Sequence, residues 1–214
     1  MLLDSDHEPG DTAHRAYLPS ENLWGGERIK EILKPALRLF IIAIIAAGLL
    51  GGTYLLTKGP IEEQELAAQT AARTAVLPAA KEFREFQTEI PEEYSFINGI
   101  YEGFSADGKL AGYTIHMTAK GYNPDIVLTL GVDHDGVITA LNVGSNSESP
   151  GLGANASKPE FYEQFAGKTA GLNVTKGPAG ENEISAISGA TITTRGITEA
   201  VDRALQYFSE YIVQ

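Results

Sequence analysis

The 214-residue sequence contains no cysteine. This absence excludes disulfides, thiolate metal sites, iron–sulfur clusters and a cysteine-linked lipid anchor, and it leaves no cysteine pattern that would indicate the redox compartment. Histidine is scarce as well, and the four histidines show no metal-ligand spacing: His7, His14, His116 and His134. We therefore expect no metal site.

Basic residues are outnumbered by acidic ones, 16 against 28, which gives a formal net charge of −12. Nucleic-acid binding needs a basic face that neutralises phosphates, so nucleic acid is not an expected partner. The spacing of serine, histidine and acidic residues also suggests no catalytic triad. A hydrolytic enzyme is therefore the least expected class.

Charge is absent altogether from residues 39–56, LFIIAIIAAGLLGGTYLL. As a helix, this segment would span about 27 Å, close to the hydrocarbon thickness of a bilayer. A cleaved signal peptide is the alternative, but the segment lies well inside the chain, is long for such a signal and lacks a small-residue cleavage site. We predict an uncleaved transmembrane helix over residues 36–58, in contact with membrane lipid.

The charges on the two sides of this helix differ in sign. Basic residues precede it and acidic residues soon follow it: Arg28, Lys30, Lys34 and Arg38 before, and Glu62, Glu63 and Glu65 after. Because cytoplasmic flanks of membrane helices are enriched in Lys and Arg, the N-terminus is predicted to be cytoplasmic. We expect a single-pass protein of the inner (plasma) membrane, with the chain after residue 60 on the outer or periplasmic side.

Composition divides the chain into four parts. Residues 1–35 are predicted to form a cytoplasmic tail, disordered to about residue 25, and a helical approach to the membrane that bends at Pro35. The transmembrane helix follows, and residues 59–98 form a helical stalk whose alanine-rich run is interrupted by Pro78. Residues 99–214 form the folded domain. The alternative for the stalk is that it is simply the domain's first helix.

After Ile100 the hydrophobic pattern changes to the period of two that is typical of strands. Asp107-Gly108 and His134-Asp135-Gly136 are hairpin signals, and the second lacks the other ligands of a calcium loop. A short helix is predicted around residues 159–165, and the final segment has an apolar stripe at helical spacing: Ile197, Val201, Ala204, Leu205 and Phe208. These patterns predict an α+β fold with a mostly antiparallel sheet and packing helices.

A cluster of hydroxyls, ISGATITTRG, spans residues 187–196 and opens this final helix. The first turn of a helix has unpaired N–H groups and a positive dipole end, which together favour a phosphate. Ser188 and Gly189 allow a close backbone approach, while Thr191, Thr193 and Thr194 offer hydroxyls. The alternative is that these residues merely cap the helix.

A second small-residue loop, ESPGLG, covers residues 148–153. It joins Glu148 to a proline-stiffened turn at Pro150, and Gly151 and Gly153 let the backbone approach a flat ligand. Leu152 supplies an apolar face. An ordinary strand-to-helix connection is the alternative.

Together, ESPGLG and SGATITT resemble the two signature segments of a known family. This is the FMN-binding domain of the G subunit of Rnf electron-transport complexes and of the C subunit of sodium-translocating NADH:quinone reductases. In that family the loop typically reads E-T-P-G-L-G and the later motif S/T-G-A-T. The resemblance covers about residues 60–214, and the single membrane helix also matches. Residues 121–126, GYNPDI, are similar to the family segment G-Y-G-G-P-I and include Tyr122.

The resemblance implies a role for the hydroxyl cluster. The last threonine of S-G-A-T, here Thr191, carries one FMN per chain through a phosphoester to the flavin phosphate. The neighbours Ser188, Gly189, Ala190, Thr193 and Thr194 then shape the turn and bind the phosphate. A separate flavin transferase, with FAD as donor, makes the ester. The family usually has Asp three residues before this motif, whereas this chain has Ser185, with Glu183 nearby.

By this resemblance the chain is an electron-transfer subunit of a membrane-bound, ion-translocating oxidoreductase that works with other membrane subunits. No residue is expected to act on a small substrate. The alternatives are the quinone-reductase C subunit and a membrane-tethered binding or assembly module without flavin. Tyr122, Glu148, Leu152 and Phe161 are the predicted neighbours of the flavin ring, although Tyr122 and Phe161 could equally be core residues.

Overall fold

The computed structural model describes residues 26–213, so the predicted disordered tail over residues 1–25 lies outside the described residues. The chain divides into two compact units, Met1–Pro60 and Ile61–Gln214. In chain order the elements are α1 (Gly26–Val76), β1 (Glu82–Glu85), η1 (Glu92–Tyr94), β2 (Ile97–Phe104), β3 (Leu110–Ala119), β4 (Ile126–Val132), β5 (Ile138–Val143), η2 (Gly153–Ser157), α2 (Pro159–Tyr162), η3 (Glu163–Phe165), β6 (Asn173–Thr175), β7 (Glu183–Ser185), α3 (Thr191–Tyr207) and the π-helical turn η4 (Phe208–Ile212).

The long helix α1 contains the charge-free segment found in the sequence. Its side chains from residue 32 to Pro60 are exposed, and it is the one helix among the described residues that is long and apolar enough to cross a membrane. The helix runs without a break through Pro35 and Pro60. A proline removes one backbone hydrogen bond, and a long helix of strong helix formers can absorb that loss. A membrane anchor is consistent with this helix.

The predicted stalk over residues 59–98 differs from the structure in its second half. The helix ends at Val76, because Pro78 disfavours the helical conformation at the residue before it. Residues beyond that point contribute β1, which pairs with β2 at the edge of the sheet. Thus only residues 59–76 of the predicted stalk are helical as part of α1, and the predicted stalk from Ile61 onward belongs to the second unit, which also contains the sheet.

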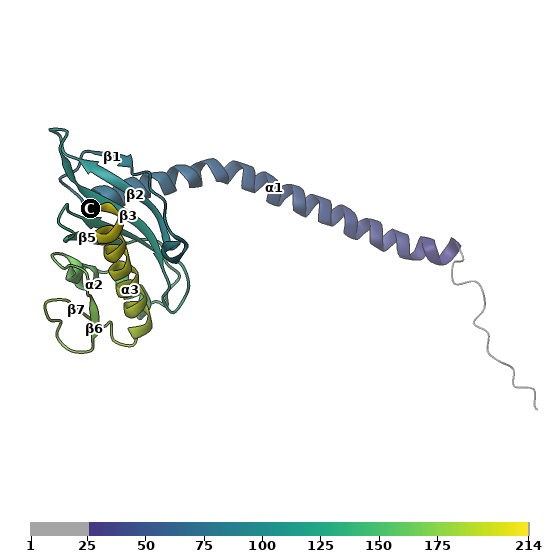
Figure 1. Ribbon diagram of the computed structural model, residues 1–214. Helices are drawn as coiled ribbons and strands as arrows, with labels where there is room; N and C mark the ends of the chain where they lie inside the picture. The colour runs from purple at the N-terminus through teal and green to yellow at the C-terminus, as the bar shows by residue number, and fades with distance from the viewer. Residues whose placement is uncertain (1–25, 214) are drawn as a thin grey trace, which may run out of the picture. The chain divides into compact units, whose positions relative to one another are not determined.

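The sheet of the domain is an antiparallel meander of five strands in the order β1–β2–β3–β4–β5 (Figure 1). Both predicted hairpins are confirmed. Gly108 and Gly136 adopt φ of 73° and 81°, the left-handed conformation that such turns need. A small parallel pair, β6–β7, is separate from this sheet and contacts α3. The predicted α+β class with a mostly antiparallel sheet is confirmed.

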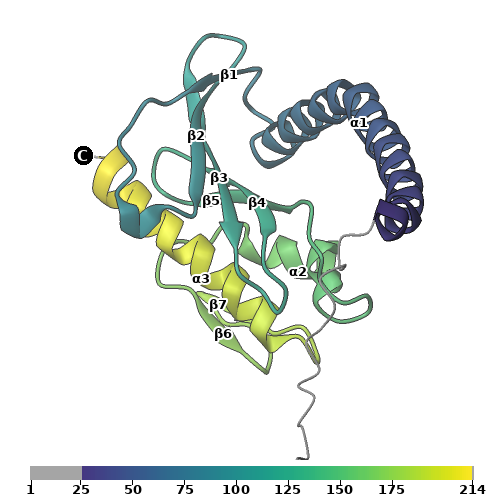
Figure 2. The ribbon, with the colours of Figure 1, turned by 90° about the vertical axis from the view of Figure 1, so that its right-hand side faces the viewer.

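The hydrophobic core lies between the sheet and α3, which runs across one face of the sheet (Figure 2). The apolar stripe predicted from the sequence is buried, as expected for the face of an amphipathic helix that packs on a sheet. Its partners on the sheet are alternate residues of β3 and β4: Ile115, Met117, Ala119, Ile126, Leu128 and Leu130. This packing fixes the position of α3 and therefore of its first turn.

A buried polar cluster lies at the C-terminal end of α1, which belongs to the second unit. The Arg73 guanidinium lies 3.6 Å from the centre of the Tyr101 ring, and Arg73 Nε donates to His116 Nε2 at 3.1 Å. The other ring nitrogen of His116 faces Thr129 Oγ1 at 3.3 Å. Burial, and then the Arg73 cation, lowers the pKa of His116 to about 4. The histidine is thus neutral at pH 7 and can accept from arginine. We call these four residues the Arg73 cluster.

Candidate functional site

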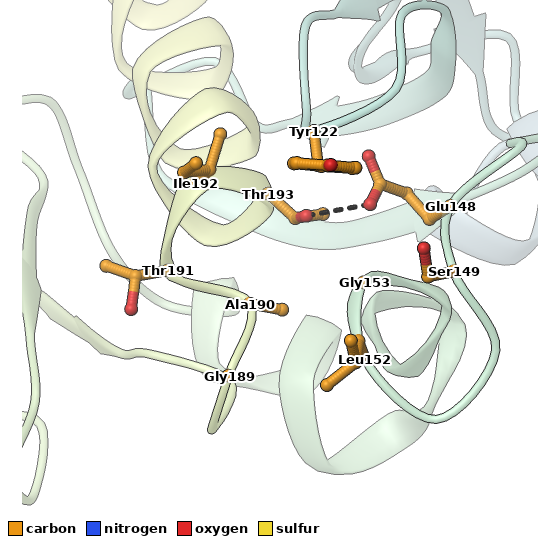
Figure 3. A pocket seen from close by; sticks show the side chains of 10 residues that line it. All are labelled: Tyr122, Glu148, Ser149, Leu152, Gly153, Gly189, Ala190, Thr191, Ile192 and Thr193. Carbon is orange, nitrogen blue, oxygen red and sulfur yellow. Dashed lines mark hydrogen bonds between the residues drawn. The ribbon is translucent and has the colours of Figure 1, made fainter.

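A cleft of about 390 Å³ opens where two loops meet the start of α3 (Figure 3). One loop connects β3 to β4, and the other follows β5 and contains the ESPGLG segment. The cleft falls within the size range of small-molecule sites in proteins. Its lining residues are Tyr122, Glu148, Ser149, Leu152, Gly153, Gly189, Ala190, Thr191, Ile192 and Thr193.

The predicted start of the last helix is confirmed, because Thr191 is the first residue of α3. The preceding residue, Ala190, has no side chain that can cap the helix, and the Thr194 amide is bonded to Ala190 O at 3.0 Å. The amides of residues 191–193 precede this bond, and the first three amides of a helix have no acceptor within it. Together with the helix dipole, they form a positive end at the edge of the cleft.

The four hydroxyls of the cluster fall into two pairs. Thr193 is 1% exposed and its Oγ1 donates to Glu148 Oε2 at 2.9 Å. Thr194 is also buried, donating to Ala190 O and accepting from the Ile187 amide, both at 3.1 Å. Thr191, in contrast, is only partly buried, and Ser188 is exposed. The inner pair holds the loop to the helix, and the outer pair faces solvent.

Glu148 forms part of the cleft wall, with 6% of its surface exposed. Its Oε2 accepts from Thr193, and its Oε1 accepts from the backbone amide of Asn123 at 2.9 Å. Two glycines make this approach possible, since a Cβ at Gly121 or at Gly153 would collide with the carboxylate. The segments around residues 121, 148 and 193 therefore converge on one buried acid.

The mouth of the cleft is apolar. Tyr122, Leu152 and Ile192 are 69%, 46% and 61% exposed, and all three line this one cleft, so they form an exposed apolar patch. Gly189 adopts φ of 75°. A Cβ at this glycine would lie 2.9 Å from Leu152 Cδ2, so the ESPGLG loop packs closely against the SGAT segment at a position without a side chain. An apolar mouth beside a positive helix end suits a ligand with a flat ring and a phosphate.

Some predicted residues lie elsewhere. Phe161 is buried and packs edge-on against Phe165, with ring centres 5.6 Å apart, so it is a core residue. Pro150, Gly151, Ser188 and Thr194 are not among the lining residues of the cleft. Pro150 and Gly151 form the turn that carries Leu152, where Gly151 has φ of 78°.

Three contributors were not predicted from the sequence. Ser149 and Ile192 line the cleft, and Asn123 ties the β3–β4 loop to the loop that holds Glu148 through its backbone amide and its side chain, which donates to Ser147 O at 2.6 Å. Asn123 lies in the GYNPDI segment, which was a usable signal. Among the described residues, no group of three or more His, Asp or Glu side chains could hold a metal ion.

Comparison with known proteins defines the class. Residues 121–206 match the FMN-binding domain family, and this stretch contains every residue that lines the cleft. Residues 26–76, the whole of α1, match the RnfG N-terminal region. The protein is therefore an FMN-binding-domain protein with an RnfG-type N-terminal helix.

Two relatives narrow this class to a family. The G subunit of the Na⁺-translocating ferredoxin:NAD⁺ oxidoreductase complex of Acetobacterium woodii is 37% identical over 196 residues, covering 84% of this chain and 92% of the relative. The G subunit of an ion-translocating oxidoreductase complex of Methanosarcina acetivorans is 32% identical, covering 84% and 96%. The chain belongs to the RnfG family, the G subunits of ion-translocating oxidoreductase complexes.

The fold is shared with a solved structure. The C subunit of the Na⁺-translocating NADH-quinone reductase of Parabacteroides distasonis superposes with a TM-score of 0.50 at 23% identity, over 63% of this chain and 79% of that one. This likeness shows the fold alone. The predicted resemblance to the Rnf G subunit is confirmed, and the relatives favour it over the C-subunit alternative.

Proposed function

We propose that this chain relays electrons within an ion-translocating oxidoreductase complex, through one FMN attached by a phosphoester to Thr191 Oγ1. The observation that carries the proposal is the position of Thr191. It is the first residue of α3, it is only partly buried, and it lines the cleft inside the FMN-binding-domain match. A phosphate on its oxygen would lie beside the helix end that stabilises negative charge.

The residues of the cleft divide the work of holding FMN. The amides of residues 191–193 and the exposed Ser188 hydroxyl would bind the phosphate, while Tyr122, Leu152 and Ile192 would pack on the isoalloxazine ring. The bound flavin would supply the redox chemistry, and the protein would orient it and exclude water from one face. A covalent link would keep the cofactor in place without relying on affinity.

Thr191 would need help to form the ester, since an unactivated threonine hydroxyl is a weak nucleophile. We propose that a flavin transferase uses FAD as donor. The Thr191 oxygen forms a bond to the phosphorus of the FMN half, the phosphoanhydride bond breaks, AMP leaves, and the hydroxyl proton passes to a base of the transferase. No oxidation or reduction accompanies this transfer.

Flavin attachment can be tested in the full-length protein, co-expressed with a flavin transferase. We expect a flavin-fluorescent band on a denaturing gel for the wild type, none for Thr191→Ala, and a retained band for Thr169→Ala, a control at an exposed threonine outside the cleft. A dark wild-type band would favour the flavin-free tethered module. Fluorescence that survives in Thr191→Ala would move the attachment to another residue.

We propose that α1 anchors the chain in the inner membrane, with the N-terminus cytoplasmic and the FMN domain on the outer or periplasmic side, in contact with other membrane subunits. The unequal flanking charges support this orientation. Because the chain has no cysteine, single cysteines report topology cleanly. We expect Ala106→Cys to react with an impermeant maleimide in cells whose inner membrane is intact, and Ser5→Cys only after that membrane is broken. The reverse pattern would contradict the orientation.

A further inference from the structure

Glu148 is held by donors at both of its carboxylate oxygens. Oε1 accepts from the Asn123 amide and Oε2 from the Thr193 hydroxyl, each at 2.9 Å. The three residues are far apart in sequence, since Asn123 lies 25 positions before Glu148 and Thr193 lies 45 positions after it. A single acid therefore joins two loops and a helix, and we call these three residues the Glu148 cluster.

The chain is shaped closely around this carboxylate. Gly121 and Gly153 leave room for it where any other side chain would collide, and a Cβ at Gly153 would also lie only 2.8 Å from Thr193 Oγ1. Buried polar groups must be hydrogen-bonded to be tolerated, and here both oxygens are. Nothing in this arrangement requires a ligand to complete it.

The first turn of α3 presents two sides to its surroundings. Figure 3 shows Thr193 directed toward Glu148 and Tyr122, while Thr191 lies on the far side of the helix start with its side chain turned away from them. The carboxylate therefore contacts the turn on one side, and the hydroxyl proposed to carry the phosphate projects on the other. This separation also keeps two anions apart.

We infer that Glu148 is a positioning residue: by holding Thr193 it fixes the first turn of α3, and thereby sets where Thr191 presents its hydroxyl for modification. This inference rests on the proposed function. It differs from the sequence-based prediction of Glu148 as a flavin neighbour, because the carboxylate acts through the protein. Ala190 cannot cap the helix, and this turn is bonded instead through Thr193 to Glu148 and through Thr194 to Ala190 and Ile187.

Replacing each partner separates positioning from a direct effect of charge. Thr193→Val removes the hydroxyl and keeps the shape, and Glu148→Ala removes the acid. Glu148→Gln keeps both links, because its oxygen can accept from Asn123 and its amide can donate to Thr193 Oγ1. Thr198→Val is the matched control, since this buried threonine lies further along the same helix and donates to Thr194 O at 2.8 Å.

The measurement is the initial rate of FMN attachment by a flavin transferase to the full-length protein in detergent. We expect Thr193→Val and Glu148→Ala each to slow attachment by about tenfold or more, and the double variant to be no slower than either single one. Glu148→Gln and Thr198→Val should stay close to the wild type. Attachment to Thr193→Val at the wild-type rate, or to Glu148→Gln as slowly as to Glu148→Ala, would overturn the inference.

A second readout does not need flavin. Hydrogen exchange of the amides of residues 191–195 in the FMN-free protein should be faster in Thr193→Val than in the wild type and unchanged in Thr198→Val. Unchanged exchange in Thr193→Val would overturn the positioning role. If the wild type takes up no FMN while its exchange pattern is as expected, the proposed function fails and the positioning role stands.

Discussion

The Glu148 cluster and the Arg73 cluster are both buried, and each holds one charged side chain with neutral partners. They differ in where the chain places them. The Arg73 cluster lies on the face of the sheet, in the middle of β2, β3 and β4, and α1 covers it. The Glu148 cluster is built on two loops at the ends of strands and on the first turn of α3, beside an open cleft.

The comparison teaches that a buried polar network alone does not mark a functional site. Strand faces are fixed by the backbone ladder, so a polar group there contributes to stability. Loops at strand ends are fixed by their side chains, so a polar group there decides what the neighbouring surface can present. We therefore expect changes in the Arg73 cluster to alter stability and changes in the Glu148 cluster to alter flavin attachment.

The largest effect should come from a glycine beneath the end of α1, the helix that also carries Arg73. Gly131→Ala would drive a Cβ into the carbonyl of Val76 and the Thr139 hydroxyl beneath the end of α1. We expect it to lower the free energy of unfolding by about 3 kcal/mol, because this overpacking meets backbone.

Thermal unfolding of the full-length protein in detergent measures this loss. The folded fraction of Gly131→Ala should still accept flavin. Gly153→Ala, on the cleft side, should reduce flavin attachment even in its folded fraction. Equal loss of attachment in both variants would contradict the view that packing beneath the end of α1 serves stability while packing beside the cleft serves flavin attachment.

The second effect is a pH dependence of stability that comes from His116 in the Arg73 cluster. The pKa of His116 is about 4 in the folded protein against 6.5 for an unperturbed histidine, so the unfolded chain binds the extra proton first as pH falls. The contribution of His116 to the free energy of unfolding is therefore fully present above about pH 6.5 and is lost as the pH falls toward 4.

Between pH 7 and pH 5 we expect a loss of about 2 kcal/mol from this group. Unfolding titrations of the wild type and His116→Gln, compared across this range, isolate the contribution of His116 from that of the carboxylates. If the free energy of unfolding changes with pH in the same way in both proteins, His116 does not make the expected contribution.

The smallest effect on stability should be that of Tyr122→Ala. Tyr122 is 69% exposed, so its removal should change the free energy of unfolding by less than about 0.5 kcal/mol. If its ring packs on the flavin, the visible absorption spectrum of the attached FMN should shift. An unchanged spectrum would place the flavin away from this side of the cleft.

Much of the fold could be predicted from local signals. Asp107-Gly108 and His134-Asp135-Gly136 identified both hairpins, and the apolar stripe identified α3, because turns and amphipathic helices are determined by nearby residues. The end of α1 near Pro78 followed from the same kind of signal. The unbroken course of α1 through Pro35 and Pro60 could not be predicted from such a signal.

The site was only partly predictable. The two glycine loops were recognised by their resemblance to a family, and the structure brings them together. The bond between Glu148 and Thr193 spans 45 residues, so no local pattern could indicate it. Likewise Phe161 had two equal interpretations, and only the packing against Phe165 decided that it is a core residue.

The most direct test of the central proposal is tandem mass spectrometry of the tryptic peptide 177–195, GPAGENEISAISGATITTR, from protein matured with a flavin transferase. It contains five hydroxyl residues, Ser185, Ser188, Thr191, Thr193 and Thr194, so the fragment ions can assign the modified one. We predict a mass increase of FMN less one water, located on Thr191 alone. An unmodified peptide, or the same increase on any of the other four residues, would contradict it.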